Sequence, residues 1–469
     1  MAYTIDQKPN QLAGANSPMV FVLKEDSPAI YNANKFRYIA QVYISTTDAS
    51  TWVEKAKIKI HKNSANVGIV DVHKIVRSYL ETQEQNVGNQ ETIVGSIHSI
   101  GISDTSNSYS QNTSQVVGVK LVGGYEKASS ATAAPEETLD QANTIIYSIP
   151  ASTPYTDTGT NVGGLDIDGT NNPLTNYIPS GATKKFLTNA PRVQFVRGSS
   201  TAGDNVDELT IAFINDGLIT DGDVLVKMAI EYYNSAGGQI GSTKYFTNDT
   251  GSGGKATADD VKNSLLYFGC GTANLQNQVD VNDAQPSDFA DWAYYVIYGA
   301  DGSGNQETDK YYFYRYGSGA KVDDRHQSCT RYDNVRLAWR NRLGAWDYMN
   351  FRGKSTESVD ITRSDAGSVP GTWDSDKFNY NNWDRGKKTL YTEATRKLTI
   401  NSDWLNEDEG VWLEELFTST NVQILADNNV VYPVVITDKR YTKKTSVNNK
   451  IKIQYTVKLE YANKVRTNS

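Results

Sequence analysis

The chain has little of what disulfide scaffolds, metal centres and disordered proteins depend on. Its 469 residues include two cysteines, four histidines and twelve prolines. Cys270 and Cys329 are too few to build a disulfide framework, and the sequence leaves open whether they pair with each other. The low proline content argues against a disordered low-complexity chain.

Long apolar runs and an excess of positive charge are also missing. No stretch approaches the roughly 18 apolar residues that mark a membrane-spanning helix. The first residues, 1–9, contain no apolar signal core. We therefore expect a protein that is made in a cytoplasm and does not span a membrane. The net charge of -8 is modest for this length and gives no support for nucleic-acid binding.

No motif for catalysis or metal binding is complete. Asp166–Thr170 matches the nucleophile loop of haloacid-dehalogenase-like phosphatases, but no apolar strand precedes it, and it lacks the glycine and glutamate of an EF-hand. Thr250–Lys255 lacks the first glycine and the magnesium-binding hydroxyl of a phosphate loop. His326 and Cys329 supply two ligands where zinc needs three or four. We therefore predict no cofactor, no metal and no enzyme, with a hydrolase that uses a carboxylate pair outside any motif as an alternative.

What the chain does have is tyrosine and alternating strand patterns. Twenty-nine tyrosines stand against twelve phenylalanines, a bias that suits half-polar β surfaces and interfaces. The strand candidates are 19–23, 36–44, 58–60, 116–125, 192–196, 208–214, 224–233, 292–298, 311–316, 357–361, 389–400, 422–425, 431–436 and 451–461. The three helix candidates are 71–81, with Asp71 as N-cap, 258–268 and 404–418. This pattern predicts a mainly β protein of several β-sandwich-like blocks, with a few short helices and long loops.

Composition divides the chain into four expected blocks. Residues 1–127 form a β-rich domain, and residues 128–184 form an extended Ser/Thr/Gly-rich insertion that reaches toward a neighbour. Residues 185–329 form a β-sandwich-like domain, and residues 330–469 form a β-rich domain with one helix. A second long loop is expected at 363–388, and either loop is a candidate for a contact between subunits.

The segment Tyr332–Gly353 concentrates arginines and aromatic residues in a strand–turn–strand pattern. Val335, Leu337 and Trp339 alternate with other residues, so we assign them to a core face. The remaining residues, of types enriched at protein interfaces, are candidates for contacts between subunits: Arg336, Arg340, Arg342, Trp346 and Tyr348. The arginines are expected to pair with the acidic residues of 407–415, in this chain or in a neighbour.

Several stretches carry a resemblance to a known group of proteins. They are Gln7–Asn10, Ser17–Phe21, Phe36–Tyr43, Val70–Tyr79, Asn334–Tyr348, Thr442–Ser446 and Gln454–Ala462. These stretches resemble virion structural proteins of tailed phages that infect Bacteroidetes or marine bacteria. The resemblance implies a virion-located structural protein of the tail, baseplate or neck, in several copies around a symmetry axis. It implies a homo-oligomeric ring, closed through β and loop contacts, that also binds other virion proteins.

The aromatic residues also allow a second function. Trp373, Tyr380 and Trp383 lie in a polar stretch, where exposed rings can stack on sugars. This alternative is a glycan-binding module, either in a tail fibre that recognises a host-surface glycan or in a secreted protein. It predicts exposed, coplanar aromatic rings on one sheet.

Overall fold

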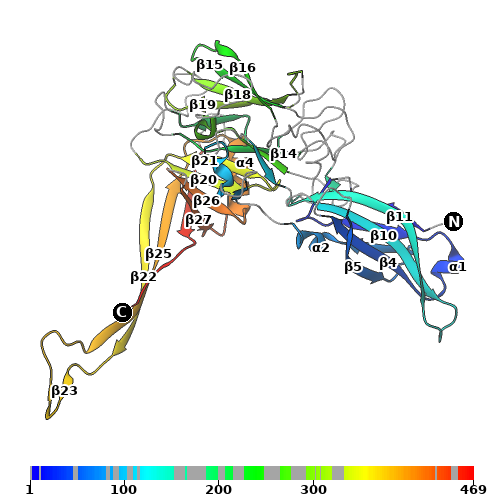
Figure 1. Ribbon diagram of the computed structural model, residues 1–469, viewed down its shortest axis with the longest axis horizontal. Coiled ribbons are helices and arrows are strands. Elements are labelled where there is room, and N and C mark those ends of the chain that lie inside the picture. The colour runs from blue at the N-terminus through cyan, green and yellow to red at the C-terminus, as the bar shows by residue number, and fades with distance from the viewer. Residues whose placement is uncertain are drawn as a thin grey trace. The chain divides into compact units, whose positions relative to one another are not determined.

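The described part of the protein consists of two compact, mainly β units. The computed structural model describes residues 3–9, 12–45, 51–80, 85–87, 94–102, 109–112, 117–152, 164–165, 186–198, 206–214, 227–247, 265–275, 292–300, 303–306, 308–318, 332–427, 430–444 and 453–468. The first unit comprises Met1–Asp324 with Arg340–Asp347, and the second comprises Arg325–Trp339 with Tyr348–Ser469. Figure 1 shows sheets in both units and few helices, which confirms the predicted fold class.

Two sheets form the N-terminal part of the first unit. One has the order β12-β2-β11-β10-β4-β5 and the other the order β1-β3-β6. The strands of the larger sheet are β2 (Leu12–Gly14), β4 (Asn34–Ser45), β5 (Val53–Ile60), β10 (Val117–Ala128), β11 (Glu136–Ile149) and β12 (Gly164–Leu165). The strands of the smaller sheet are β1 (Thr4–Gln7), β3 (Val20–Lys24) and β6 (Val67–Asp71). The short helices are α1 (Pro28–Tyr31) and α2 (His73–Arg77).

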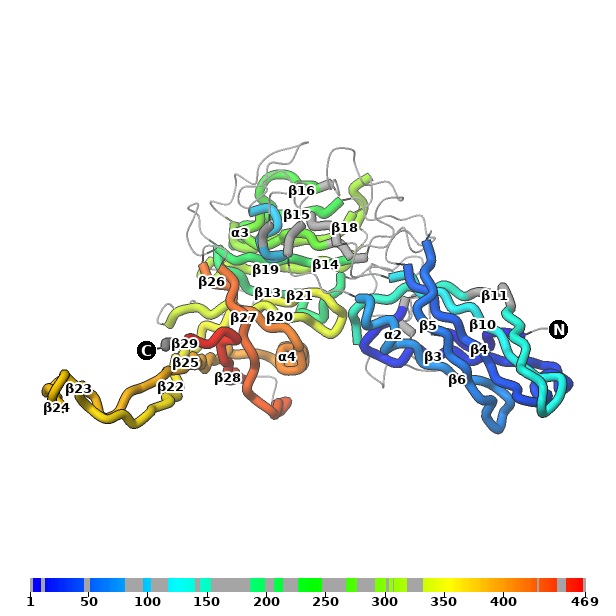
Figure 2. The backbone as a smooth tube through the Cα atoms, turned by 60° about the horizontal axis from the view of Figure 1, so that its bottom comes forward, coloured from blue at the N-terminus to red at the C-terminus, as the bar shows by residue number. Residues whose placement is uncertain are grey.

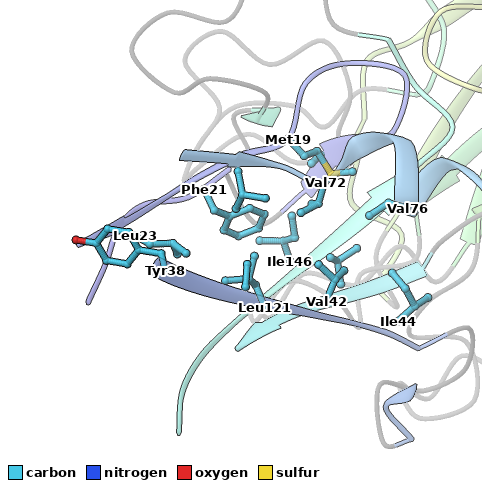
Figure 3. Close-up of a cluster of buried hydrophobic side chains, with 14 of the residues drawn as sticks. Met19, Phe21, Leu23, Tyr38, Val42, Ile44, Val72, Val76, Leu121 and Ile146 are labelled. Atoms are coloured by element: carbon cyan, nitrogen blue, oxygen red, sulfur yellow. The ribbon is translucent and has the colours of Figure 1, made fainter. Parts of the chain in front are cut away.

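Apolar side chains fill the space between these two sheets. Phe21 and Leu23 of β3 point toward Val42 of β4 and Leu121 of β10, as Figure 3 shows. All four are fully buried or nearly so. The strands predicted at 19–23 and 36–44 are confirmed, and their buried side chains form the inner faces of two packed sheets.

Two sequence predictions in this region need correction. The helix predicted for 71–81 covers only His73–Arg77, because Asp71 is still paired with Val20 as the last residue of β6. Residues 136–149, predicted to be loop, form β11, which pairs with β10 from Val117↔Ser148 to Lys127↔Glu136. Backbone pairing to a neighbouring strand prevails here over the weak strand propensity of the polar side chains.

The middle part of the first unit contains two more sheets. A five-stranded sheet has the order β13-β19-β18-β15-β16, and a three-stranded sheet has the order β14-β17-β9. Their strands are β13 (Val193–Val196), β15 (Lys227–Tyr233), β16 (Gln239–Thr247), β18 (Tyr294–Ala300), β19 (Tyr311–Arg315), β9 (Tyr109–Asn112), β14 (Thr210–Ile214) and β17 (Leu265–Gly269). Smaller elements are β7 (Gln85–Val87), β8 (Val94–Ser96), the 3-10 turn Ile97–Ser99 and α3 (Thr272–Leu275).

The helix predicted for 258–268 is wrong over its described part. Residues 265–268 belong to β17, which pairs with β14 on one side and β9 on the other. A short apolar run fits a buried strand as well as a helix, and two neighbouring strands decide for the strand here.

Within its described residues, the second unit consists of one large sheet, the small β23–β24 hairpin and one helix. The sheet order is β21-β20-β26-β27-β28-β25-β22, and β29 also pairs with β25. The elements are β20 (Val335–Arg340), β21 (Trp346–Phe351), β22 (Thr356–Gly367), β25 (Lys387–Asn401), α4 (Glu407–Thr418), β26 (Val422–Ala426), β27 (Val430–Ile436), β28 (Thr456–Tyr461) and β29 (Val465–Asn468). Trp339 contacts Trp412 of α4, with ring centroids 5.0 Å apart.

Helix α4 confirms most of the helix predicted for 404–418. Its start is fixed by a reciprocal capping box. The Asn406 side chain accepts from the Glu409 N–H at 2.7 Å, and the Glu409 carboxylate accepts from the Asn406 N–H at 2.7 Å. These bonds satisfy backbone donors that the first helical turn leaves without partners.

An extended hairpin arm is the most distinctive part of the second unit. Strands β22 and β25 run side by side away from the rest of the unit, and the small hairpin of β23 (Thr372–Asp374) and β24 (Lys377–Asn379) lies beyond them (Figures 1 and 2). We call residues 356–401 the arm and residues 368–386 its tip. Both flanks of the expected 363–388 loop are therefore strand, because the backbones of β22 and β25 stay paired as far as Gly367↔Lys387.

Candidate assembly surface

The arginine and aromatic residues predicted to form an interface are mostly buried within the chain. Arg336 is 2% exposed, Arg340 7%, Trp346 2% and Tyr348 4%, while Arg342 is half-buried. The predicted alternation in β20 is also incomplete, because every residue from Arg336 to Arg340 is buried. These side chains therefore do not form an exposed surface for a neighbouring subunit, which corrects the prediction.

Arg340 instead holds the turn between β20 and β21. Its Nη1 donates to the Gly344 carbonyl at 2.8 Å and to the Tyr267 hydroxyl at 3.3 Å. Its guanidinium lies 5.2 Å from the ring centroid of Trp346. The Asn341 side chain accepts from two backbone N–H groups of the same turn, at 2.9 and 3.0 Å. Arginine and aromatic residues at this density thus build a rigid buried turn.

The arm has the opposite character, because its apolar side chains are exposed. Val359 is 47% exposed and Ile361 is 52% exposed. Ile361 is paired with Ala394, and Ala394 is paired with Val465. Ile361, Ala394 and Val465 therefore lie on the same face of the sheet, and Val465 is 54% exposed. The inner end of this face is buried at Leu398 and Ile400. The apolar face of the sheet therefore continues along the arm beyond the part that is buried in the unit.

Charged groups on the other face of the arm are paired with one another. Lys397 lies 2.5 Å from Asp360, and Glu393 lies 2.8 Å from Lys464 and 3.3 Å from Arg466. Hydrogen bonds from these two cations, before any other cause, lower the pKa of Glu393 below its usual value. The arm thus has one face of paired charges and one face on which Val359 and Ile361 lie between the charged residues Glu357 and Arg363.

The tip carries the most exposed aromatic residues of the described chain. Trp373 is 69% exposed, Tyr380 72% and Trp383 77%. The expectation that these three rings face solvent is confirmed. Exposed aromatic groups of this size are costly to leave in water and mark contact sites for a protein or a ligand.

A second aromatic cluster crosses the five-stranded sheet of the first unit. Tyr233 stacks on Tyr294 with centroids 4.8 Å apart, and Tyr294 stacks on Tyr314 at 4.6 Å. The interplanar angles are 3° and 22°, so the rings cover each other's faces. Stacking covers both faces of Tyr294, so this ring has no free face on which a sugar could stack.

The Glu231 carboxylate is held beside this ladder. It accepts from Tyr233 at 2.8 Å, Tyr298 at 3.0 Å and Lys310 at 3.3 Å. Burial acts to raise the pKa of Glu231, but the two tyrosine hydrogen bonds and the Lys310 charge outweigh it, and the pKa is lowered. Together with Thr243, which donates at 3.5 Å, these donors hold the Glu231 carboxylate in its ionised form within the sheet.

The motifs weighed in the sequence contribute nothing to a described site. Asp166–Thr170, Thr250–Lys255, His326 and Cys329 lie outside the described residues. Cys270 is buried after β17. Among the residues that the structure describes, no group of three or more His, Cys, Asp or Glu side chains is placed to hold a metal ion. Within the same residues, no helix is long and apolar enough to cross a membrane.

Comparison with known proteins identifies no family and no shared fold for this chain. No protein-family model and no curated protein matches the sequence. Among solved structures, Salmonella alpha-2-macroglobulin reacted with methylamine aligns at 9% identity and a TM-score of 0.17, over 97% of this chain and 23% of that one. A point mutant of that protein aligns at 7% identity and a TM-score of 0.18, over 99% of this chain and 30% of that one. The chain thus spans less than a third of these structures, and scores so low show no shared fold.

Proposed function

We propose that this protein is a structural component of a phage virion, present in several copies of a tail, baseplate or neck assembly. The observation that carries the proposal is the arm, on which the apolar residues Val359, Ile361 and Leu390 are 47%, 52% and 48% exposed. Beyond Tyr391, where β29 no longer flanks β25, the arm is a two-stranded ribbon. Such a ribbon is marginally stable in water, so we expect a neighbouring molecule to order it.

The proposal agrees with the resemblance in the sequence. Subunits of an assembly hold one another through surfaces that reach beyond their own core. The arm is such a surface, and it takes the role that the sequence analysis assigned to Arg336, Arg340 and Arg342. A virion location and contacts with other virion proteins are part of the proposal.

Assembly is tested with the purified full chain and one shortened variant. In that variant a two-residue Asn-Gly turn replaces residues 368–386, which closes the hairpin between Gly367 and Lys387. Sedimentation velocity of the unaltered chain should show an oligomer, and an image of the particle should contain this chain at a repeated position. A chain that stays monomeric at high concentration and is absent from the particle refutes the proposal.

Glycan binding is the second candidate, and the tip favours it. Trp373, Tyr380 and Trp383 all face solvent on a short polar segment. Replacing these three residues with Ser separates the two functions, because it removes sugar stacking while it leaves β22 and β25 intact. Loss of polysaccharide binding with unchanged oligomer size supports the glycan function. No binding by the unaltered chain removes it.

A further inference from the structure

Strand β22 leaves one edge of the large sheet open. It pairs with β25 along its whole length, and it stands last in the strand order of the sheet. In the part of the chain that the structure describes, no strand pairs with its other edge. Most native edge strands are short or blocked, because their free N–H and C=O groups bind other strands. An open edge on a strand of 12 residues, whose register is regular from Thr356 to Ser364, is therefore a site for a further strand.

The side chains on one face of β22 follow a self-complementary order. Glu357, Val359, Ile361 and Arg363 share this face, since their partners alternate regularly from Leu398 to Thr392 and the first irregularity comes only after Ser364. The order is negative, apolar, apolar, positive. All four are exposed, and neither Glu357 nor Arg363 forms an ion pair with a described residue.

We propose that β22 pairs antiparallel with β22 of a second copy of this chain, about a two-fold axis at Asp360. Glu357 then lies opposite Arg363 of the partner subunit, and Val359 lies opposite Ile361 of the partner subunit. Because of the two-fold axis, each of these pairs occurs twice in the contact. Opposite charges and β-branched residues are both favourable when they face each other across antiparallel strands.

The order of side chains selects this register over its neighbours. Opposite residues of antiparallel strands share a face, so a two-fold axis must pass through a residue. An axis at Ile361 places Arg363 opposite Val359 and Glu357 opposite Asp365, so both Glu–Arg pairs are lost. An axis at Val359 places Glu357 opposite Ile361 and leaves Arg363 without an acidic partner.

The axis residue itself is compatible with the contact. Asp360 points to the opposite face of the strand and lies opposite its own copy. Its carboxylate lies 2.5 Å from Lys397 of the same chain, so each carboxylate enters the contact already paired with a cation. Two such ion pairs repel each other far less than two bare carboxylates do.

This inference rests on the proposed function and names the partner as a second copy. The contact is isologous, with the same patch used by both copies, and it joins two chains. A ring needs a separate head-to-tail contact. Two-fold pairing of arms therefore joins two rings, or two chains of adjacent layers, rather than closing one ring.

Charge exchange tests the pairing in the full chain. Glu357→Arg places like charges opposite each other, as does Arg363→Glu, and each change should raise the dissociation constant of the dimer by about tenfold or more. The double variant restores opposite charges in reverse order and should return the constant to near the original value. Sedimentation equilibrium measures all four proteins.

A cysteine at the axis tests the register. Opposite residues of antiparallel strands have Cα atoms about 4.5–5.5 Å apart, which a disulfide spans. Asp360→Cys should therefore form a disulfide with its own copy under mild oxidation, found by mass spectrometry as one peptide linked to itself. Thr356→Cys is the matched control, because two copies of residue 356 lie about 27 Å apart in this register.

The outcomes separate this inference from the proposed function. Restoration by the double variant, with cross-linking at 360 and none at 356, supports the pairing of β22. An oligomer that none of these changes affects overturns the pairing and leaves the assembly function standing. A chain that is monomeric at all concentrations overturns both.

Discussion

Removing the Arg340 side chain should destabilise the first unit rather than weaken assembly. Arg340→Ala removes the hydrogen bond to the Gly344 carbonyl at 2.8 Å and the contact with Trp346 at 5.2 Å. A hydrogen bond from a charged group contributes about 1.5–3 kcal/mol, and a buried cation–π contact adds about 0.5–2 kcal/mol. The expected loss in the free energy of unfolding is therefore about 3 kcal/mol.

Urea denaturation followed by tryptophan fluorescence measures this loss, since Trp346 lies at the altered site. A loss of about 3 kcal/mol moves the midpoint of the transition by about 1 M urea or more. Arg340→Lys should show an intermediate loss, because it keeps the charge without the planar group that stacks on the ring.

Arg385→Ala is the matched control for a change in net charge. Arg385 is exposed at the tip, and surface substitutions of this kind change stability by no more than about 0.5 kcal/mol. Equal midpoints for Arg340→Ala and Arg385→Ala, with a smaller oligomer for the former, would refute the burial argument. That result would return Arg340 to the subunit interface predicted from the sequence.

Three further changes test the packing of both units. Asn406→Ala removes the cap of α4 and should cost the second unit about 1 kcal/mol, measured by urea denaturation. Glu231→Gln should reduce the loss of folding stability of the first unit as the pH falls. The lowered pKa of Glu231 means that its contribution is fully present above its ordinary pKa of 4.5 and is lost as the pH falls below it, which acid titration followed by circular dichroism detects. Gly344→Val should lower the thermal midpoint of the first unit, because φ is +85° at this position and a Cβ there would lie 2.9 Å from the Pro150 carbonyl oxygen. A wild-type midpoint for this variant would contradict the described turn.

Secondary structure was predicted correctly where the order of apolar and polar residues fits only one type of element. The alternation in 36–44 and the apolar run 19–23 predicted β4 and β3, because each presents one face to a shared core. The helix ending at Thr418 was predicted from its apolar residues and its run of acids. Neither prediction needed knowledge of a distant residue.

Predictions failed where a distant strand decided the outcome. Residues 136–149 are polar enough to be taken for a loop, yet β10 pairs with them along nearly their whole length. Residues 265–268 are apolar enough for a helix, and the two neighbouring strands β14 and β9 make them a strand. Backbone hydrogen bonds between distant segments do not depend on the side chains. Such pairing therefore gives neither segment a hydrophobic periodicity from which it could be predicted.

The interface residues show the same limit most clearly. The amino-acid pattern predicts a mainly β protein rich in tyrosine, and it indicates that Trp373, Tyr380 and Trp383 face solvent. The burial of Arg340 and the exposure of β22 follow from the packing of the folded chain, because burial depends on what covers a residue. The sequence does not distinguish an arginine that is buried in a turn of its own chain from an arginine that is buried against another subunit.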